Sequence, residues 1–519
     1  MDEKNLKKLP LGLSDFRKII TGDYVYVDKT QLIHQMITGG EYYFISRPRR
    51  FGKSLLVSTL AELFSGNKEL FKNLWIGSSD YDWPQYPVIR FDFSAIGHRT
   101  TTEFIANMHA WLDGIVHDKN INVSSNLPID SKFREIIVQL SKINKVAILI
   151  DEYHKPILDH IDDMQEAKEQ REILKSLYSV IKGSDQYLRF VLLTGVSKFS
   201  KTSVFSGINN LYDISLSEKY AILFGYTEQE LYKNFVEHLE QFVPVYGTTI
   251  GHVVTRLRDQ YDGYSFSRNA EQVFNPYSVL TCLTEKKLGN YWFASGTPTV
   301  LIRLIQQQDY DIDTITHPVV NETSLDAFEP DDIELAALLF QTGYLTIKNF
   351  DSKTSNYTLG VPNREVHNGL TIQLADVFTG LQANKSIQYA RIIARAFIHN
   401  DMEELAHKLQ EFFNKMPYTV HIKSESQLQF VLYAIFALIG VTVDPEVVTS
   451  LGRADLIVTF PKLVYVIELK FNGSAAAALA QIQDKKYCEK YENTGKQIML
   501  VGINFDEPTK TVSLEACGV

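Results

Sequence analysis

The chain has 519 residues, of which 45% are hydrophobic, 12% aromatic and 22% charged, and its formal net charge is −10 with a pI near 5.8. This length predicts roughly three domains, and the apolar content excludes a mainly disordered chain. The acidic balance excludes a generally basic nucleic-acid coat, so any contact with nucleic acid must come from a local patch.

The beginning of the chain, MDEKNLKKLP, is charged and lacks the apolar segment of a signal peptide. No run of about 18 apolar residues occurs, so no membrane-spanning helix is expected. Cys282, Cys488 and Cys517 lie too far apart for a disulfide framework or a metal-ligand spacing. These features predict a cytoplasmic protein in a reducing compartment, with no membrane partner.

Residues 1–215 alternate short apolar runs with helical patterns. The runs rich in β-branched and aromatic residues cover 42–46, 87–93, 145–151 and 188–194. Continuous runs of this kind are typical of strands buried on both faces, and the long segments between them leave room for crossover helices. The pattern predicts an α/β domain with a parallel sheet, in which SLLVSTLAELF (54–64) is a helix.

The string RPRRFGKS (47–54) follows the first of these strands and precedes the helix. Gly52, Lys53 and Ser54 match the end of the phosphate-loop pattern G-x-x-x-x-G-K-[ST], whereas Arg47 stands where the first glycine belongs. In that interpretation Lys53 binds the β- and γ-phosphates and Ser54 coordinates Mg²⁺. The alternative is a basic surface turn before an ordinary helix. The residues predicted to bind nucleotide here are Arg49, Arg50, Phe51, Gly52, Lys53, Ser54 and Leu55.

Two carboxylates end the third apolar run, KVAILIDEYH (145–154). This arrangement is typical of a Walker B strand, in which Asp151 holds Mg²⁺ and Glu152 polarises the attacking water. The alternative is an acidic strand end that caps the next helix. Thr194 ends the neighbouring run, where its hydroxyl is predicted to sense the γ-phosphate or position the water, or simply marks the exit from a strand.

Residues 216–410 are predicted to form a mainly helical middle domain with a small β element. The helical patterns include EQELYKNFVEHLEQF (228–242) and DDIELAALLFQTGYL (331–345). The only strand signals are YLTIKN and NYTLGV, which we expect to pair across the FDSKTS turn.

Residues 411–519 are predicted to form a small α/β module. QLQFVLYAIFALIG is apolar nearly all round, which indicates a buried helix. A hairpin of ADLIVTF and LVYVIELKF follows, then a helix over AAAALAQIQDKKYCEKYEN and a strand over KQIMLVGINF.

Two acids and a lysine are predicted to meet at this hairpin. The two-residue period of a strand places Glu468 and Lys470 on one face, and the hairpin brings Asp455 close to them. Such a set can hold Mg²⁺ or Mn²⁺ through the carboxylates, while Lys470 orients water or stabilises charge during phosphodiester hydrolysis. The alternative is a salt-bridged pair of strands. The numbers of basic and acidic residues are nearly equal from residue 415 onward, and such a near-zero net charge is unfavourable for binding the DNA phosphate backbone.

Three further side chains have two interpretations each. Glu425 begins the buried helix, where it either points toward the same site or caps the helix. Gln481 and Tyr487, on the following helix, either line the cleft or lie on the surface.

Strings along nearly the whole chain resemble the bacterial AAA-ATPase-like family with a C-terminal PD-(D/E)XK nuclease domain. They include LPLGLSDFRKI, YVYVDKT, FISRPRRFGKSLL, ILIDEYHKPI, LLTGVSKFSKTSVFSGINNL, YDGYSF, NYWFASGTP, LLFQTGYLTI, VPNREV, GRADLIV and VIELKFNGSAAAALAQI. The resemblance implies an AAA+-like P-loop parallel sheet, a helical middle domain and a restriction-endonuclease-like α/β domain. The residues that it implies for nucleotide chemistry are Lys53, Ser54, Asp151 and Glu152, and those for nuclease chemistry are Glu425, Asp455, Glu468 and Lys470, with Gln481 and Tyr487 as helix partners. His154 departs from the pattern, since aspartate is more usual after DEY.

The function predicted first is an ATPase coupled to a metal-dependent DNA nuclease, with ATP and Mg²⁺ as cofactors and Mn²⁺ as an alternative at the nuclease site. The alternatives are a nucleotide-dependent switch or scaffold whose nuclease-fold module binds without cutting, and an ATP-dependent protein remodeller. The oligomeric state is left open, with Arg189 and Arg256 as conceivable donors to a neighbour's site.

Overall fold

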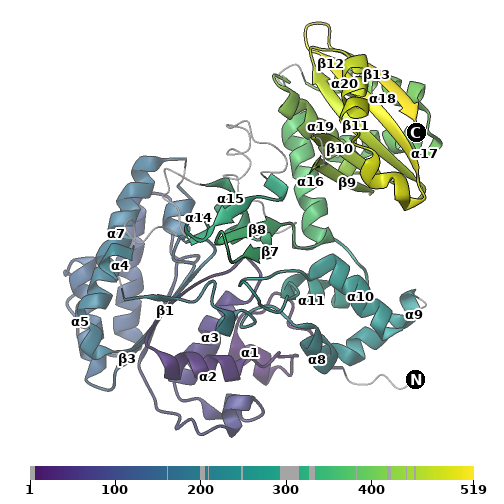
Figure 1. Cartoon of the computed structure of the whole chain (residues 1–519). Coiled ribbons are helices and arrows are strands. Elements are labelled where there is room, and N and C mark those ends of the chain that lie inside the picture. The colour runs from purple at the N-terminus through teal and green to yellow at the C-terminus, as the bar shows by residue number, and fades with distance from the viewer. Residues whose placement is uncertain are drawn as a thin grey trace. The chain divides into compact units, whose positions relative to one another are not determined.

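The computed structural model in Figure 1 describes residues 6–160, 162–198, 205–208, 210–246, 249–292, 315–326, 334–381, 383–417, 422–439, 441–448 and 452–519. Predictions that fall on other residues, such as 331–333 of the expected helix and parts of the LLTGVSKFSKTSVFSGINNL and NYWFASGTP strings, lie outside this described part. The chain divides into two compact units, one of Met1–Ser295 with Val319–Glu365 and one of Gly296–Pro318 with Val366–Val519. The division into three domains at 215 and 410 stays a prediction.

The first unit is built on a parallel five-stranded sheet of order β2-β3-β4-β1-β5. Its strands are β1 (Tyr42–Ser46), β2 (Val88–Asp92), β3 (Val146–Asp151), β4 (Leu188–Gly195) and β5 (Tyr212–Asp213). Every residue of β3 is buried, as its continuous apolar run predicts. The four strands expected from the sequence are therefore confirmed, and the short β5 is an addition.

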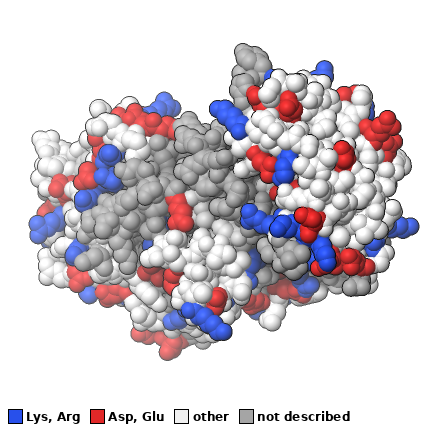
Figure 2. Space-filling model, turned by 45° about the horizontal axis from the view of Figure 1, so that its top comes forward, with Lys and Arg blue, Asp and Glu red and all other residues white. Residues whose placement is uncertain are grey.

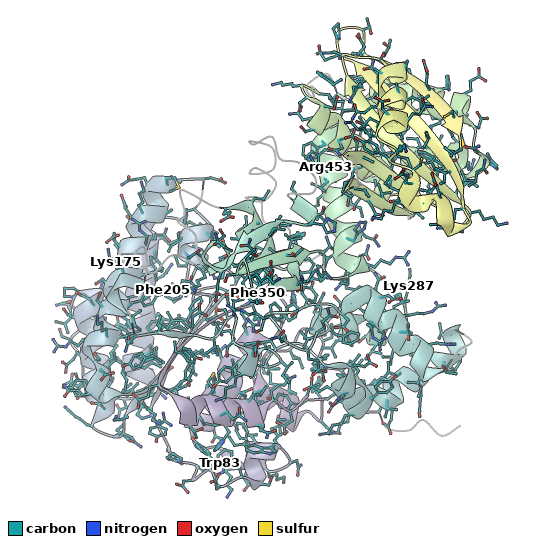
Figure 3. All side chains as sticks on the ribbon, viewed as in Figure 1. Trp83, Lys175, Phe205, Lys287, Phe350 and Arg453 are labelled. Atoms are coloured by element: carbon teal, nitrogen blue, oxygen red, sulfur yellow. The ribbon has the colours of Figure 1, made fainter. Side chains whose placement is uncertain are left out.

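Helices cover this sheet (Figure 1), with α4, α5 and α7 on one side and α1, α2 and α3 on the other. Their bounds are α1 (Phe16–Thr21), α2 (Thr30–Gly39), α3 (Lys53–Phe64), α4 (Thr101–Asp118), α5 (Ile129–Ser141), α6 (Lys155–Leu158) and α7 (Met164–Gly183). Aromatic rings fill the layers between them: Phe205, labelled in Figure 3, packs 5.3 Å from Phe44 and 5.0 Å from Tyr153 between ring centroids.

The rest of the first unit is helical with one small sheet. Its helices are α8 (Glu228–Glu240), α9 (Val243–Tyr246), α10 (Ile250–Tyr261), α11 (Pro276–Glu285), α14 (Glu322–Asp326) and α15 (Leu335–Thr342). The sheet has the order β6-β8-β7, from β6 (Val319–Asn321), β7 (Thr346–Asp351) and β8 (Asn356–Gly360). β7 and β8 pair antiparallel, which confirms the predicted hairpin.

The second unit is a mixed sheet of order β13-β12-β11-β10-β9 packed with helices. Its strands are β9 (Thr442–Val448), β10 (Arg453–Thr459), β11 (Leu463–Phe471), β12 (Gln497–Asp506) and β13 (Thr511–Gly518). Its helices are α17 (Ala383–His399), α18 (Met402–Lys415), α19 (Glu425–Ala437) and α20 (Ala475–Asp484), and α16 (Arg364–Thr379) leads into it from the first unit. Residues Leu428–Ala437 of α19 are all buried, as predicted.

Two details of the second unit differ from the sequence prediction. The helix expected over 475–493 ends at Asp484, because Lys486 takes a left-handed φ of +49° and the chain turns Tyr487 into the core beside Ile482. The edge strands β9 and β13 were not predicted. Exposed and half-buried residues alternate along β13, so it lacks the continuous apolar run by which the inner strands were found.

None of the described helices is both long enough and apolar enough to cross a membrane.

Glycine at position 502 allows α20 to lie directly on β12. A β-carbon there would collide with the carbonyl oxygen of Ala475 and would lie 2.6 Å from the amide nitrogen of Leu479. We expect Gly502→Ala to lower the free energy of unfolding by about 1–3 kcal/mol, because helix backbone cannot yield as a side chain can. Urea unfolding checks this. Gly114→Ala in α4, where the added carbon meets nothing within 4 Å, should instead be neutral or stabilising.

Candidate functional site

The side chain of Lys53 folds back over the loop between β1 and α3 and hydrogen-bonds to the backbone of that loop. Gly52, which precedes α3, has a φ of +99°, a conformation that disfavours residues with a β-carbon. Lys53 is only 4% exposed, and its Nζ donates to the carbonyl oxygens of Arg47 (3.0 Å) and Pro48 (3.2 Å). The same ammonium lies 3.5 Å from Oε1 of Glu152, so the two predicted motifs meet here.

Asp151 is buried at the end of β3, and hydroxyl groups from two other elements contact it. The Thr194 hydroxyl donates to Oδ1 at 2.6 Å, and the Ser54 side chain also hydrogen-bonds to this carboxylate. Burial raises the pKa of Asp151, and these two hydrogen bonds oppose the rise. A carboxylate and a serine hydroxyl on adjacent elements are hard oxygen donors of the kind that fit Mg²⁺.

Glu152 is held at both oxygens. It adopts a left-handed φ of +54°, and while Oε1 faces Lys53, Oε2 lies 3.3 Å from Nε2 of the buried His154. Burial, the largest single effect, opposes ionisation of Glu152, but the positive charge around it, that of Lys53 foremost, and the hydrogen bond with Lys53 together outweigh burial, so the pKa of Glu152 lies below its usual value. The carboxylate is thus ionised at neutral pH and able to accept a proton.

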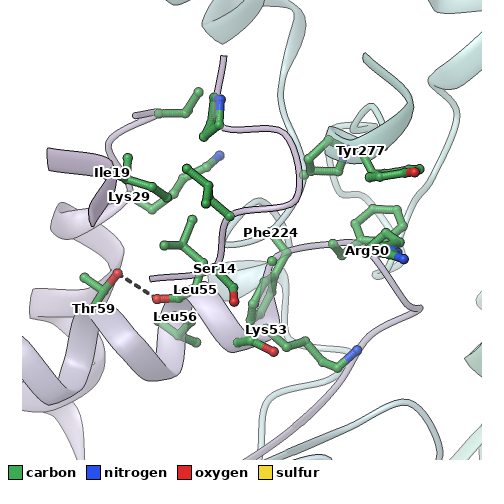
Figure 4. A pocket seen from close by; sticks show the side chains of 18 of the residues that line it. Ser14, Ile19, Lys29, Arg50, Lys53, Leu55, Leu56, Thr59, Phe224 and Tyr277 are labelled. Carbon is green, nitrogen blue, oxygen red and sulfur yellow. Dashed lines mark hydrogen bonds between the residues drawn. The ribbon is translucent and has the colours of Figure 1, made fainter. Parts of the chain in front are cut away.

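A cavity of about 570 Å³ adjoins these residues within the first unit. Every residue of the loop that the sequence assigns to nucleotide binding lines it, together with Glu152. Figure 4 shows Lys53 and Arg50 on one side of the cavity and Ile19 and Thr59 on the other. Its volume lies within the usual range for small-molecule sites, so it can accept a charged group beside the loop and an apolar body beyond it.

Sequence reasoning missed the opposite wall of this cavity. The lining residues without a prior assignment include Ser14, Tyr26, Lys29, Phe224 and Tyr277. Ser14, Tyr26 and Lys29 belong to the LPLGLSDFRKI and YVYVDKT strings, which were noted for the resemblance only. Tyr277 belongs to the string VFNPYSVL (273–280), which likewise contributes to the resemblance, whereas Phe224 carries no local signal because it comes from a segment more than a hundred residues beyond the loop.

Residues that come after the parallel sheet in the sequence pack against the phosphate loop (47–54). Arg47 is 2% exposed; its Nη1 donates to the carbonyl oxygens of Ser46 (2.9 Å) and Ser215 (2.6 Å), and its guanidinium lies 4.2 Å from the ring centroid of Phe266. Arg47 therefore anchors the loop at the position where a glycine was expected.

Two more contacts complete this enclosure. The ring of Phe51 packs 4.8 Å from that of Tyr264, and the Trp292 indole donates to the carbonyl oxygen of Arg49 at 3.2 Å. Trp292 is held in turn by its amide, which donates to the fully buried Glu365 at 2.8 Å. Residues of the YDGYSF and VPNREV strings, together with Trp292, thus hold the loop in place.

Of the two conceivable arginine donors, Arg189 contacts its own chain, donating to the carbonyl oxygen of Ile37 at 2.8 Å. Arg256 lies exposed on α10.

A second cluster forms at the β10–β11 hairpin of the second unit. Asp455 Oδ2 accepts a hydrogen bond from the Leu469 amide at 2.7 Å, which ties the two strands together at this point. Lys470 Nζ lies 3.5 Å from Oε1 of Glu468 and 3.5 Å from Oε1 of Glu425. The structure therefore brings all four predicted nuclease residues together.

The structure also distinguishes the alternatives for the helix residues. Ser424, not Glu425, caps α19, and Glu425 faces the lysine. Gln481 donates from Nε2 to Oε1 of Glu468, so it belongs to the cluster. Tyr487 is 3% exposed and packs in the core, with its hydroxyl close to Gly452.

Among the described residues no group of three acidic, histidine or cysteine side chains converges as a metal site, but two carboxylates of this cluster are candidate oxygen ligands for a divalent cation. Glu468 is 2% exposed and its Oε2 has no hydrogen-bond partner within the described part of the chain, so a buried oxygen is left to be satisfied. Asp455 lies near it, because the antiparallel register that pairs Leu456 with Ile467 places Asp455 opposite Glu468 on the neighbouring strand. Two carboxylates of this kind suit Mg²⁺ or Mn²⁺.

We expect the affinity of this cluster for Mn²⁺ to rise with pH. Burial, and next the charge of Asp455, raise the pKa of Glu468 above its usual value. A proton therefore competes with the cation below that raised pKa, and binding should tighten as pH rises through it and level off above it. Calorimetric titrations at pH 6 and pH 9 check this, and Glu468→Gln should remove both the binding and its pH dependence. Equal affinity at both pH values would contradict the assignment.

Comparisons with known proteins match the two stretches of the chain in which these clusters lie. A family model described as "Predicted AAA-ATPase" matches residues 10–205, and one described as "PD-(D/E)XK nuclease superfamily" matches residues 423–515. A protein of Azotobacter chroococcum mcd 1, described as "Uncharacterized protein in vnfD 5'region", is 36% identical over 520 residues, covering 98% of each chain.

Proposed function

The chain belongs to the predicted AAA-ATPase family and has a C-terminal domain of the PD-(D/E)XK nuclease superfamily, and from this we propose that it hydrolyses ATP and cleaves DNA with a divalent metal ion. The observation that carries the proposal is the convergence, in each unit, of residues that are distant in the sequence. Lys53 meets Glu152 beside the cavity, and Glu425 meets Glu468 and Lys470 at the hairpin.

In the first unit, ATP would lie in the cavity with its phosphates at the start of α3. Lys53 would leave the carbonyl oxygens of Arg47 and Pro48 to bind the β- and γ-phosphates. Ser54 and Asp151 would hold Mg²⁺, which neutralises phosphate charge when bound. Glu152 would accept the proton of the water that attacks the γ-phosphorus, and Thr194 would keep Asp151 in place.

In the second unit, Asp455 and Glu468 would hold Mg²⁺ or Mn²⁺, which supplies Lewis acidity and an activated water when bound. The Leu469 amide fixes the Asp455 carboxylate, and Gln481 fixes one oxygen of Glu468. Lys470, held between Glu425 and Glu468, would orient the water or neutralise charge that develops on the scissile phosphate.

The proposal is tested with the full-length chain. Supercoiled plasmid is incubated with Mg²⁺ or Mn²⁺, with and without ATP, while phosphate release is followed in parallel. We expect metal-dependent nicking and ATP hydrolysis, and faster nicking with ATP if the two activities are coupled. If properly folded protein neither nicks the plasmid nor hydrolyses ATP with Mg²⁺ and also does neither with Mn²⁺, the proposal is wrong.

A second function is favoured by the charge distribution. Basic and acidic residues nearly balance from residue 415 onward, and on the face shown in Figure 2 lysines and arginines are interspersed with acidic residues. A module of this kind grips DNA weakly by itself. In this alternative the chain is a nucleotide-dependent switch whose nuclease fold binds nucleic acid or a partner without cutting, and plasmid binding without nicking in every metal would support it.

A further inference from the structure

We propose that His154 is a positioning residue that orients Glu152 for ATP hydrolysis through a neutral imidazole. The inference rests on the proposed ATPase function and assigns a role to a residue at which the chain departs from the resemblance. Two observations support this inference. Each ring nitrogen of His154 has a neighbouring polar group, and Gly195 of β4, which lacks a β-carbon, leaves room for the ring.

The hydrogen bond that the ring accepts at Nδ1 fixes its tautomer. The Val196 amide donates to Nδ1 of His154 at 3.3 Å, so Nδ1 is an acceptor and carries no proton. The proton of a neutral imidazole is then on Nε2, which lies 3.3 Å from Oε2 of Glu152. The ring thus accepts a hydrogen bond from the residue that follows β4, and its protonated Nε2 lies 3.3 Å from the carboxylate.

Packing holds the ring in this position. His154 is 2% exposed, and a β-carbon at Gly195 would lie 2.8 Å from its Nδ1 and 2.7 Å from the Tyr153 ring. Tyr153 is fully buried and its hydroxyl donates to the carbonyl oxygen of Ser197 at 2.9 Å, which limits movement of the turn that carries both rings. The pKa of His154 is lowered to about 4 by burial, in agreement with a neutral ring at physiological pH.

The role becomes important once nucleotide binds. In the structure Glu152 is held by Lys53 at one oxygen and by His154 at the other. When Lys53 moves to the phosphates, the contact at Oε1 is lost and His154 keeps its contact with the carboxylate. Without His154, the carboxylate would lose its contact at Oε2 as well, so the side chain would spend less time in the reactive orientation.

Three variants separate this role from a structural one. His154→Asn can still accept from the Val196 amide but cannot reach Glu152. His154→Gln can place an amide N–H where Nε2 lies. His154→Leu removes both contacts. His117→Asn, at an exposed histidine on α4, is the matched control.

We expect His154→Asn to lower kcat for ATP hydrolysis about tenfold while KM and the affinity for a fluorescent ATP analogue stay unchanged, and His154→Gln to restore most of kcat. Wild-type kcat in His154→Asn, or equal losses in His154→Asn and His154→Gln, would overturn the inference. If the wild-type chain hydrolyses no ATP, the proposed function itself fails, and that outcome is visible before any variant is compared.

Discussion

Replacing Glu152 by glutamine is expected to leave ATP bound and to lower its turnover by at least about a hundredfold. Glutamine keeps the shape of the side chain but cannot accept the proton of the attacking water. It also removes the negative charge that lies 3.5 Å from Lys53, so the lysine is freer to move to the phosphates. The affinity for nucleotide should therefore stay the same or increase. Single-turnover hydrolysis and a titration with a fluorescent ATP analogue measure the two quantities separately.

Glu172→Gln is the control for this variant, since Glu172 lies on the surface of α7 and pairs with Lys175. It should behave as wild type in both measurements. Normal turnover in Glu152→Gln would show that another group positions the water. Lost nucleotide binding in Glu152→Gln would instead show that Glu152 supports the phosphate loop itself.

Replacing Asp455 by asparagine is expected to abolish metal-dependent nicking, with a loss of at least about a hundredfold. The asparagine oxygen can still accept the hydrogen bond from the Leu469 amide, so the hairpin should keep its register. The charge that would bind the cation is lost, however, and Mn²⁺ binding should weaken together with cleavage. Plasmid nicking and calorimetric Mn²⁺ titration provide the two readouts.

Asp484→Asn, at the exposed end of α20, changes the same kind of residue outside the cluster and should cut as wild type. ATP hydrolysis should be retained in both variants, which shows that the chain is folded. Undiminished nicking by Asp455→Asn would remove the hairpin cluster as the nuclease site.

The parts of the fold that local pattern determines were predicted well. β3 and β4 are continuous apolar strands in the middle of a parallel sheet, and α19 is apolar on all sides, so burial alone identifies them. The motif residues were found because phosphate and metal chemistry require particular residue types at particular spacings.

Features that depend on tertiary contacts were not predictable. The helix after the hairpin stops at Asp484, although good helix formers follow, because the burial of Tyr487 outweighs local propensity. The sequence left Glu425 with two equal interpretations, and only its approach to Lys470 distinguishes them. Phe224 reaches the cavity from so far along the chain that no local pattern indicates it.

The enclosure of the phosphate loop determines how short a self-sufficient ATP-binding fragment of this chain can be. The AAA-ATPase match ends at residue 205, but Arg47 and Phe51 rest on Phe266 and Tyr264, and Trp292 holds the loop backbone. Truncation at 205 would remove these aromatic contacts. The guanidinium of Arg47, which is buried in the full chain, and the apolar surface beside it would then be exposed to water. A minimal soluble piece should therefore extend through Glu365, whose carboxylate secures Trp292.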